Sequence, residues 1–207
     1  MRAKVAGAVL AAGAGSRMGR PKATLRIEGR TLLARLSSAL RAGGCDPILL
    51  LVAGDLDRGA VDPIEGAAFV INPDPSRGQI SSLRCAMEAA SDAAGLLYVL
   101  VDQADIAPET VAAVLSALAE HPAAVASFRM TPGHPLAFRR DLFLDLFSRR
   151  ADGGARAVVD GWRRQGWLAQ IETADEGVTR NLNTPQDFER YRAQSQTLGR
   201  IVHGENG

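Results

Sequence analysis

The strongest constraint on the fold is the alternation of short apolar runs with amphipathic segments. Residues 47–54 and 95–102 are almost entirely apolar and too short for stable helices. Residues 31–42 and 107–121, by contrast, carry leucine or valine at helical spacing. Strands buried on both faces that alternate with helices are typical of parallel sheets. We therefore predict an α/β fold with a mostly parallel, twisted sheet.

The rest of the chain continues this pattern without a Pro/Gly/Ser-rich linker, so we expect a single domain over 1–195. The tail at 196–207 lacks a strong period and is predicted to be flexible. An antiparallel strand is expected from the 123–138 region. The further predicted strands are 5–12, 67–73, 123–128 and 167–173, and the further predicted helices are 80–93, one from 155 onward and one at about 185–194.

Composition excludes several classes of function. A formal net charge of +1 provides no general field for nucleic acid or an anionic membrane, so neither partner is expected. Cys45 and Cys85 form no CxxC or His/Cys cluster, which predicts buried thiols rather than a disulfide framework or a zinc site. The apolar run at 5–12 is too short for a membrane span or a signal peptide, and a cytoplasmic location is the default expectation.

The stretch LAAGAGSRMGRPK, residues 10–22, concentrates glycine and positive charge directly after a predicted strand. It fits neither GxGxxG, because the third glycine is Gly19, nor the P-loop, because Arg20 follows that glycine. Glycines allow backbone N–H groups to approach a phosphate, and Arg17, Lys22 and the positive end of a following helix would offset its charge. A solvated turn with surface cations is the alternative.

This stretch resembles the LxAGxGxRMGxxK signature of the MobA-like NTP transferases, and among them the MocA-like molybdenum cofactor cytidylyltransferases. The resemblance implies a three-layer α/β/α, Rossmann-like nucleotidyltransferase fold. It also implies that Arg17 and Lys22 are catalytic cations that hold the triphosphate. The nucleotide-binding residues implied in this loop are Leu10, Ala11, Ala12, Gly13, Gly15 and Ser16.

The segment GQISSLRCAM, residues 78–87, places a glycine and two serines at a predicted helix start. Helix capping alone would explain these residues. The segment is also similar to the GxSSSL-type element of MocA-like enzymes, which contacts the base. That similarity implies nucleotide contacts from Gly78, Ser81 and Ser82 and favours CTP over GTP.

Asp102 ends a predicted buried strand, and ligands of open α/β sheets bind at the carboxyl ends of strands. Mg²⁺ characteristically takes one or two carboxylates plus substrate phosphates, although such an aspartate can also be a simple turn residue. Its segment resembles the DQP element of the family, with Ala104 in place of proline and Asp105 nearby. NLNTPQDF, at 181–188, resembles the NxNTPEDL element and implies Asn183 as a second, uncharged Mg²⁺ ligand.

Two further segments resemble the acceptor side of MocA-like enzymes. PGHPLAFRRDLF, at 132–143, contains His134, and DGGARAVV, at 152–159, contains Arg156. The resemblance implies that both residues bind the acceptor. A structural histidine in a turn and an exposed arginine at a helix start are the alternatives.

Together these motifs predict in-line attack by an acceptor phosphate on the α-phosphorus of CTP, with release of pyrophosphate. The implied acceptor is the molybdenum-bound pterin phosphate, and a molybdoenzyme or its maturation factor is an implied partner. Transfer from GTP or to a sugar or alditol phosphate is one alternative. Another is a MobA-like NAD(P)H-dependent oxidoreductase acting on small heterocycles, which the missing GxGxxG disfavours. A third is a nucleotide-binding protein without catalysis.

Overall fold

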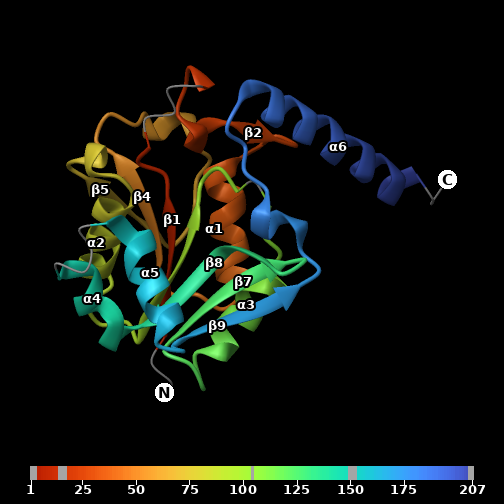
Figure 1. The fold of residues 1–207 in the computed structure, drawn as a ribbon. Helices are drawn as coiled ribbons and strands as arrows, with labels where there is room; N and C mark the ends of the chain where they lie inside the picture. Colours follow the sequence, from red (N-terminus) through yellow and green to blue (C-terminus); the bar gives the residue numbers. More distant parts are fainter. Residues whose placement is uncertain (1–3, 14–17, 104, 149–152, 205–207) are drawn as a thin grey trace.

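A seven-stranded sheet forms the centre of the molecule (Figure 1). The computed structural model describes residues 4–13, 18–103, 105–148 and 153–204, with 196–204 described by backbone alone. The strand order is β5-β4-β1-β6-β8-β7-β9. The strands are β1 (Val5–Leu10), β4 (Ile48–Ala53), β5 (Ala67–Asn72), β6 (Gly95–Leu100), β7 (Ala123–Phe128), β8 (Thr131–Arg139) and β9 (Leu168–Thr173).

The sheet is parallel except at one strand. β1 pairs in parallel with β4 on one side and β6 on the other, with Ala8 opposite both Leu49 and Tyr98. β8 is antiparallel to both β6 and β7, because the turn after β7 returns the chain directly as a hairpin. The predicted antiparallel strand and the mostly parallel α/β sheet are therefore confirmed.

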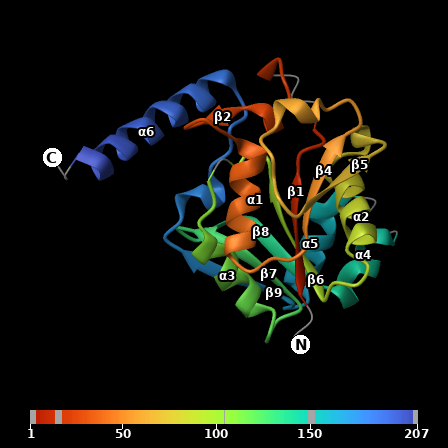
Figure 2. The ribbon, with the colours of Figure 1, turned by 180° about the vertical axis from the view of Figure 1, so that it is seen from behind.

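Helices cover both faces of the sheet, as predicted for a three-layer fold. One face carries α1 (Leu32–Ala42) and α3 (Pro108–Ala117), seen in Figure 2. The other carries α2 (Gln79–Ala89), α4 (Phe143–Phe147) and α5 (Gly154–Arg164), which gather on the left in Figure 1. α6 (Pro185–Gly204) extends away from the body.

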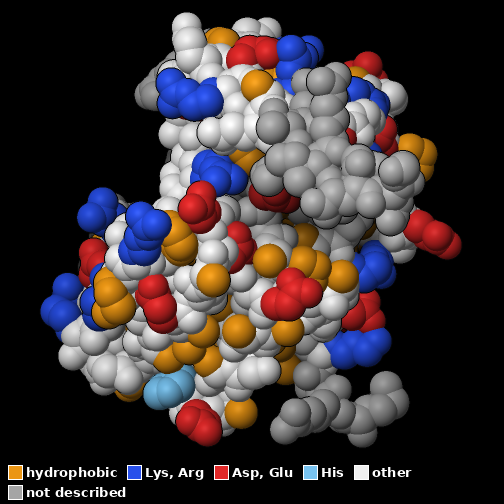
Figure 3. All heavy atoms as spheres, turned by 90° about the vertical axis from the view of Figure 1, so that its right-hand side faces the viewer, with side chains coloured by type: hydrophobic (Ala, Val, Ile, Leu, Met, Phe, Trp, Pro, Cys, Tyr) orange, Lys and Arg blue, Asp and Glu red, His pale blue; other side chains and the backbone are white. Residues whose placement is uncertain are grey.

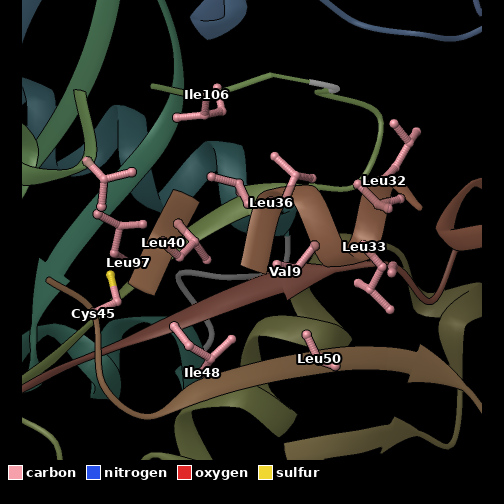
Figure 4. Packing of buried hydrophobic residues seen from close by; sticks show 14 of the residues in the cluster. Val9, Leu32, Leu33, Leu36, Leu40, Cys45, Ile48, Leu50, Leu97 and Ile106 are labelled. Atoms are coloured by element: carbon pink, nitrogen blue, oxygen red, sulfur yellow. The ribbon is translucent and has the colours of Figure 1, made fainter. Parts of the chain in front are cut away.

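The core explains why α1 forms and how it is held. Its leucines recur at helical spacing, and Leu33, Leu36 and Leu40 are buried against the sheet. Figure 4 shows these side chains with Val9 of β1 and Ile48 of β4. Burying each such side chain contributes about 1.5–3 kcal/mol, so this packing fixes the position of β1 and of the loop that follows it.

Two local predictions from the sequence need correction. The glycine-rich loop is not followed directly by a helix. Instead, a short 3-10 turn (Lys22–Thr24) and a hairpin of β2 (Arg26–Ile27) and β3 (Arg30–Thr31) precede α1. The hairpin forms because Glu28 and Gly29 both adopt positive φ, which reverses the chain.

The final helix also continues to Gly204 rather than ending near 194. The sequence after 194 includes glutamine, leucine and arginine, which have good helix propensity, and Leu198, Ile201 and Val202 recur at helical spacing. The domain boundary at 195 and a flexible tail stay predictions.

The described surface agrees with the balanced composition. Acidic and basic side chains are interspersed on the face shown in Figure 3, outside its grey atoms. Over the described ranges, no helix is long and apolar enough to cross a membrane.

Candidate active site

A cavity of about 390 Å³ opens at the carboxyl ends of β1 and β6. Ligand pockets commonly span about 300–1,000 Å³, so a nucleotide-sized ligand is compatible with it. The site arises here because the chain leaves both parallel strands at the same edge of the sheet. Its lining residues are Leu10, Ala12, Gly13, Met18, Lys22, Pro75, Gly78, Gln79, Ser82, Leu100, Val101, Asp102 and Asn183.

Lys22 joins three distant parts of the chain in this cavity. Its Nζ donates to Asp102 Oδ2 over 3.1 Å and to Asn183 Oδ1 over 3.0 Å. The side chains of Lys22 and Asp102 are only 15% and 21% exposed, so water screens this ion pair less than one at the surface. The structure thus brings together three residues that the sequence had indicated separately.

The second carboxylate oxygen of Asp102 can still accept a hydrogen bond or contact a cation. Oδ1 is buried and, within the described part of the protein, has no hydrogen-bond partner. A buried carboxylate oxygen ordinarily has one, so this atom is suited to a cation or a ligand donor. The described residues contain no group of three or more His, Cys, Asp or Glu side chains suited to a metal. One carboxylate with one amide oxygen fits Mg²⁺, which takes its remaining ligands from phosphates and water.

The loop that carries Asn183 is fastened to the turn after β6. Leu182 N–H donates to the Asp102 carbonyl over 2.8 Å, and the buried Gln103 amide donates to the Val178 carbonyl over 3.0 Å. Gly177 allows this approach, because a Cβ there would lie 1.6 Å from the Asp105 carbonyl oxygen. The position of Asn183 therefore depends on the turn that carries Asp102.

The start of α6 fixes the other end of this loop. Thr184 and Asp187 form a reciprocal capping pair, in which each backbone N–H donates to the side chain of the other residue. The Thr184 hydroxyl and the N–H groups of Thr184 and Asn183 hold the pKa of Asp187 below its usual range. Helix capping therefore orients the residue that contacts Lys22.

The start of α2 also lines the cavity. Gly78 precedes the helix with φ +77°, a conformation that glycine adopts without strain. Ser82 is buried and faces the cavity, whereas Ser81 is not among the lining residues. Both serine hydroxyls contact the side chain of Asn72, the last residue of β5.

His134 lies near the cavity without lining it. Its ring makes an edge contact with the Tyr98 ring of β6, with 5.1 Å between the ring centroids. The Tyr98 hydroxyl is in turn hydrogen-bonded to the Gln79 side chain. Burial lowers the pKa of His134 to about 4, against the opposing effect of the Asp102 charge. A neutral imidazole follows at pH 7, which can orient a ligand but supplies no positive charge for a phosphate.

The other predicted residues fall into three groups. Ala11 is buried beside the cavity between two lining residues. Arg156 lies on α5 with a side chain that is 94% exposed and is not among the lining residues, so its acceptor role stays a prediction. Gly15, Ser16, Arg17 and Ala104 lie outside the described residues.

The sequence reasoning missed Asn72 and Gln103. Both are polar, 1% exposed, and located where a strand ends or has just ended. Buried amides need hydrogen-bond partners, so a polar residue after a fully apolar run is the signal that could have found them. Their partners lie far along the chain or in another element, which local patterns do not reveal.

The chain is similar to several known proteins. Residues 7–169 match the model of the MobA-like NTP transferase domain. Nicotine blue oxidoreductase of Paenarthrobacter nicotinovorans is 30% identical over 202 residues, covering 90% of this chain and 95% of the relative. The Rv0371c homologue from Mycobacterium sp. strain JC1 superposes with a TM-score of 0.82 at 28% identity, over 96% of this chain and all of its own.

A further structural relative was solved as a metal complex. The structure of Rv0371c from Mycobacterium tuberculosis H37Rv in complex with manganese has a TM-score of 0.67 and 23% identity, covering 94% of this chain and all of its own. At this level of identity the likeness demonstrates a shared fold.

Proposed function

Because the chain belongs to the MobA-like NTP transferase family, we propose that it transfers CMP from CTP to a phosphorylated acceptor. The product is a cytidine diphospho compound, and pyrophosphate is released. The acceptor that the sequence resemblance favours is the molybdenum-bound pterin phosphate. A molybdoenzyme or its maturation factor would receive the product.

The observation that carries the proposal is the meeting of Lys22, Asp102 and Asn183 at one wall of the cavity. In the proposed reaction, an acceptor phosphate oxygen bonds to the α-phosphorus while the bond from that phosphorus to the bridging oxygen breaks. The electron pair leaves with pyrophosphate, and no covalent protein intermediate forms. Such transfers depend on positioning of the reactants and on neutralisation of phosphate charge. The Lys22 ammonium contributes to both.

Lys22 has to change partners in this reaction. Its ammonium contacts Asp102 and Asn183, and a triphosphate offers it a larger negative charge. A charge pair at about 4 Å gains roughly 4 kcal/mol at the effective dielectric of a partly enclosed site. We therefore expect Lys22 to turn toward the phosphates, with Arg17 as a second cation on the leaving pyrophosphate.

When Lys22 turns toward the phosphates, it would free the side-chain oxygens of Asp102 and Asn183 for a divalent metal. Asp102 and Asn183 would hold it, and the unpartnered Oδ1 of Asp102 supports this assignment. The manganese complex of Rv0371c supports a divalent ion in this fold. Mg²⁺ is the ion we propose, and when bound it would neutralise phosphate charge.

A screen for pyrophosphate release tests the proposal. The purified protein is incubated with Mg²⁺ and each of the four NTPs, crossed with phosphorylated acceptors that include molybdopterin forms. We expect release with CTP and an acceptor, and much less when either is omitted. Release with GTP, or with a sugar phosphate only, would contradict the proposed base or acceptor. No release in any combination would contradict catalysis.

The similarity to nicotine blue oxidoreductase favours a second candidate, an NAD(P)H-dependent reduction of a small heterocycle. In that reaction hydride moves from the nicotinamide to the heterocycle, so NAD(P)H is oxidised. A fall in absorbance at 340 nm with a heterocyclic acceptor would support this candidate. The chain lacks GxGxxG, which is why transfer from an NTP is preferred.

A further inference from the structure

Asn72 is a buried amide whose orientation is fixed by the backbone. Its Oδ1 accepts the Asp74 N–H over 3.0 Å. A backbone N–H only donates, so the oxygen of the amide faces Asp74 and the nitrogen faces the other way. That nitrogen donates to Ser81 Oγ over 2.8 Å and to Ser82 Oγ over 2.9 Å.

The direction of these bonds determines where each serine hydrogen can go. Ser81 also donates to the Gly78 carbonyl over 2.8 Å, because a carbonyl only accepts. A hydroxyl has a single hydrogen, so Ser81 has none left for a ligand. Ser82 accepts from Asn72 and keeps its hydrogen, which finds no acceptor among the described residues. Since Ser82 lines the cavity, its hydroxyl is available to donate there.

We propose that Asn72 is a positioning residue that makes Ser82 a hydrogen-bond donor toward the base of the nucleotide. This inference rests on the proposed nucleotidyl transfer and specifies the chemistry of its base site. The ligand atom opposite Ser82 must be an acceptor. Cytosine offers O2 and N3 as adjacent acceptors, whereas the N1–H and 2-amino groups of guanine donate. Guanine also accepts, at O6 and N7, so the proposal places the Ser82 hydroxyl opposite the centre of the Watson–Crick edge, where cytosine has the N3 acceptor and guanine has N1–H. At that position Asn72 favours CTP over GTP without touching either base.

The variant Asn72→Asp tests the direction of the hydrogen bond between residue 72 and Ser82, with almost no change in side-chain shape. A carboxylate donates nothing, so Ser82 would turn its hydrogen toward residue 72 and present only lone pairs to the cavity. We expect the affinity for Mg²⁺–CTP to fall about tenfold or more, and the affinity for Mg²⁺–GTP to fall less or rise. Titration calorimetry with both nucleotides measures the ratio of CTP affinity to GTP affinity. A purely structural role of Asn72 would leave this ratio unchanged.

A double-mutant cycle separates this role from damage to the fold. Ser82→Ala should lower CTP affinity to a similar degree, and adding Asn72→Asp to it should cause little further loss. Gln165→Glu makes the same amide-to-carboxylate change at the exposed end of α5 and should leave both affinities unchanged. Thermal unfolding of each variant checks that the domain is folded.

The outcomes are distinct. Wild-type affinity and base preference in Asn72→Asp would overturn this inference while leaving the proposed function intact. Losses that add fully in the double variant would overturn it too, because Asn72 would then act independently of Ser82. If the wild-type protein bound none of the NTPs, the proposed function would fail and this inference with it.

Discussion

Lys22 Nζ lies 3.1 Å from Asp102 Oδ2, although 80 positions separate the two residues in the sequence. The contact joins the end of the glycine-rich loop to the end of β6. It places a cation where the proposed metal would bind. Lys22 and a metal ion are therefore expected to compete for the same carboxylate until a triphosphate is present.

Replacing Lys22 should separate metal binding from transfer. In Lys22→Met, we expect Mn²⁺ alone to bind several times more tightly, because its competitor for Asp102 is gone. The transfer rate at saturating CTP should fall by well over tenfold, because the triphosphate loses a cation. Electron paramagnetic resonance measures free Mn²⁺, and pyrophosphate release measures transfer.

Lys4→Met is the matched control for that variant. Lys4 pairs with Asp46 at an exposed site, and lysine occurs in this chain only at these two positions. The control should leave both readouts unchanged. Unaltered transfer in Lys22→Met would remove Lys22 from the proposed mechanism.

Asp102→Asn should remove almost all Mg²⁺-dependent transfer. The substitution preserves shape but removes the charge that attracts a divalent ion, so we expect a rate loss of about a hundredfold or more. The Mg²⁺ concentration needed for half-maximal rate should also rise. A variant with wild-type Mg²⁺ dependence would show that the metal binds elsewhere.

Gly177→Ala should destabilise the loop behind the site. The added Cβ would lie 1.6 Å from the Asp105 carbonyl oxygen, so the backbone has to move. We expect the free energy of unfolding to fall by about 2–4 kcal/mol, as measured by urea denaturation. Gly161→Ala is the control. Its Cβ would meet no atom closer than 3.9 Å, and alanine should stabilise α5 by about 0.5–1 kcal/mol.

The pKa of His134 predicts a specific acid sensitivity. The folded value is lowered to about 4 from 6.5, so between these pH values the unfolded chain binds a proton that the folded chain does not. Stability should therefore fall as the pH drops from 6.5 toward 4, by up to about 2 kcal/mol at pH 5. The residue keeps some solvent contact, so the measured loss should lie below this bound.

His134→Gln should remove that contribution. Urea denaturation at pH 7.5 and pH 5 should show a smaller loss of stability in the variant than in the wild type. At pH 7.5 both side chains are neutral, so any difference there reports packing alone. Equal losses in the two proteins would contradict the lowered pKa.

Cys45 should be chemically inert in the folded protein. It is 2% exposed, and burial raises the pKa of its thiol to about 12, so almost no thiolate forms. Cys85 is less buried. We expect iodoacetamide at pH 8 to label Cys85 first and Cys45 only after urea unfolding, as followed by peptide mass spectrometry. Early labelling of Cys45 would contradict the burial of this thiol.

Local patterns in the sequence predict most of the fold, because strands buried on both faces leave an unambiguous apolar signal. The 123–128 strand was predicted with the bounds that the structure shows. The hairpin before α1 was missed, since strands of two residues leave no period to detect. The extension of α6 was missed because glycines at 199 and 204 interrupt the tail, and the apolar repeat of Leu198, Ile201 and Val202 is short.

The candidate site was predicted only as separate pieces. Lys22, Asp102 and Asn183 were each indicated by a motif, but their convergence depends on β1 and β6 being neighbours in the sheet. Asn72 lies in no motif, Gln103 lies in the DQP-like element without a role assigned to it, and the partners of both are set by tertiary contacts. Patterns along the chain therefore locate the residues that face a ligand better than those that hold them in place.

The fastening of the 176–184 loop to the turn after β6 has a consequence for protein synthesis. Asn183 is synthesised late, whereas the glycine-rich loop and Asp102 leave the ribosome much earlier. A nascent chain that has built its central sheet still lacks one wall of the cleft. A product shortened before Leu182 would lack the Asn183 oxygen of the candidate site, and it would also lack Leu182, Phe188 and Tyr191 of the buried core.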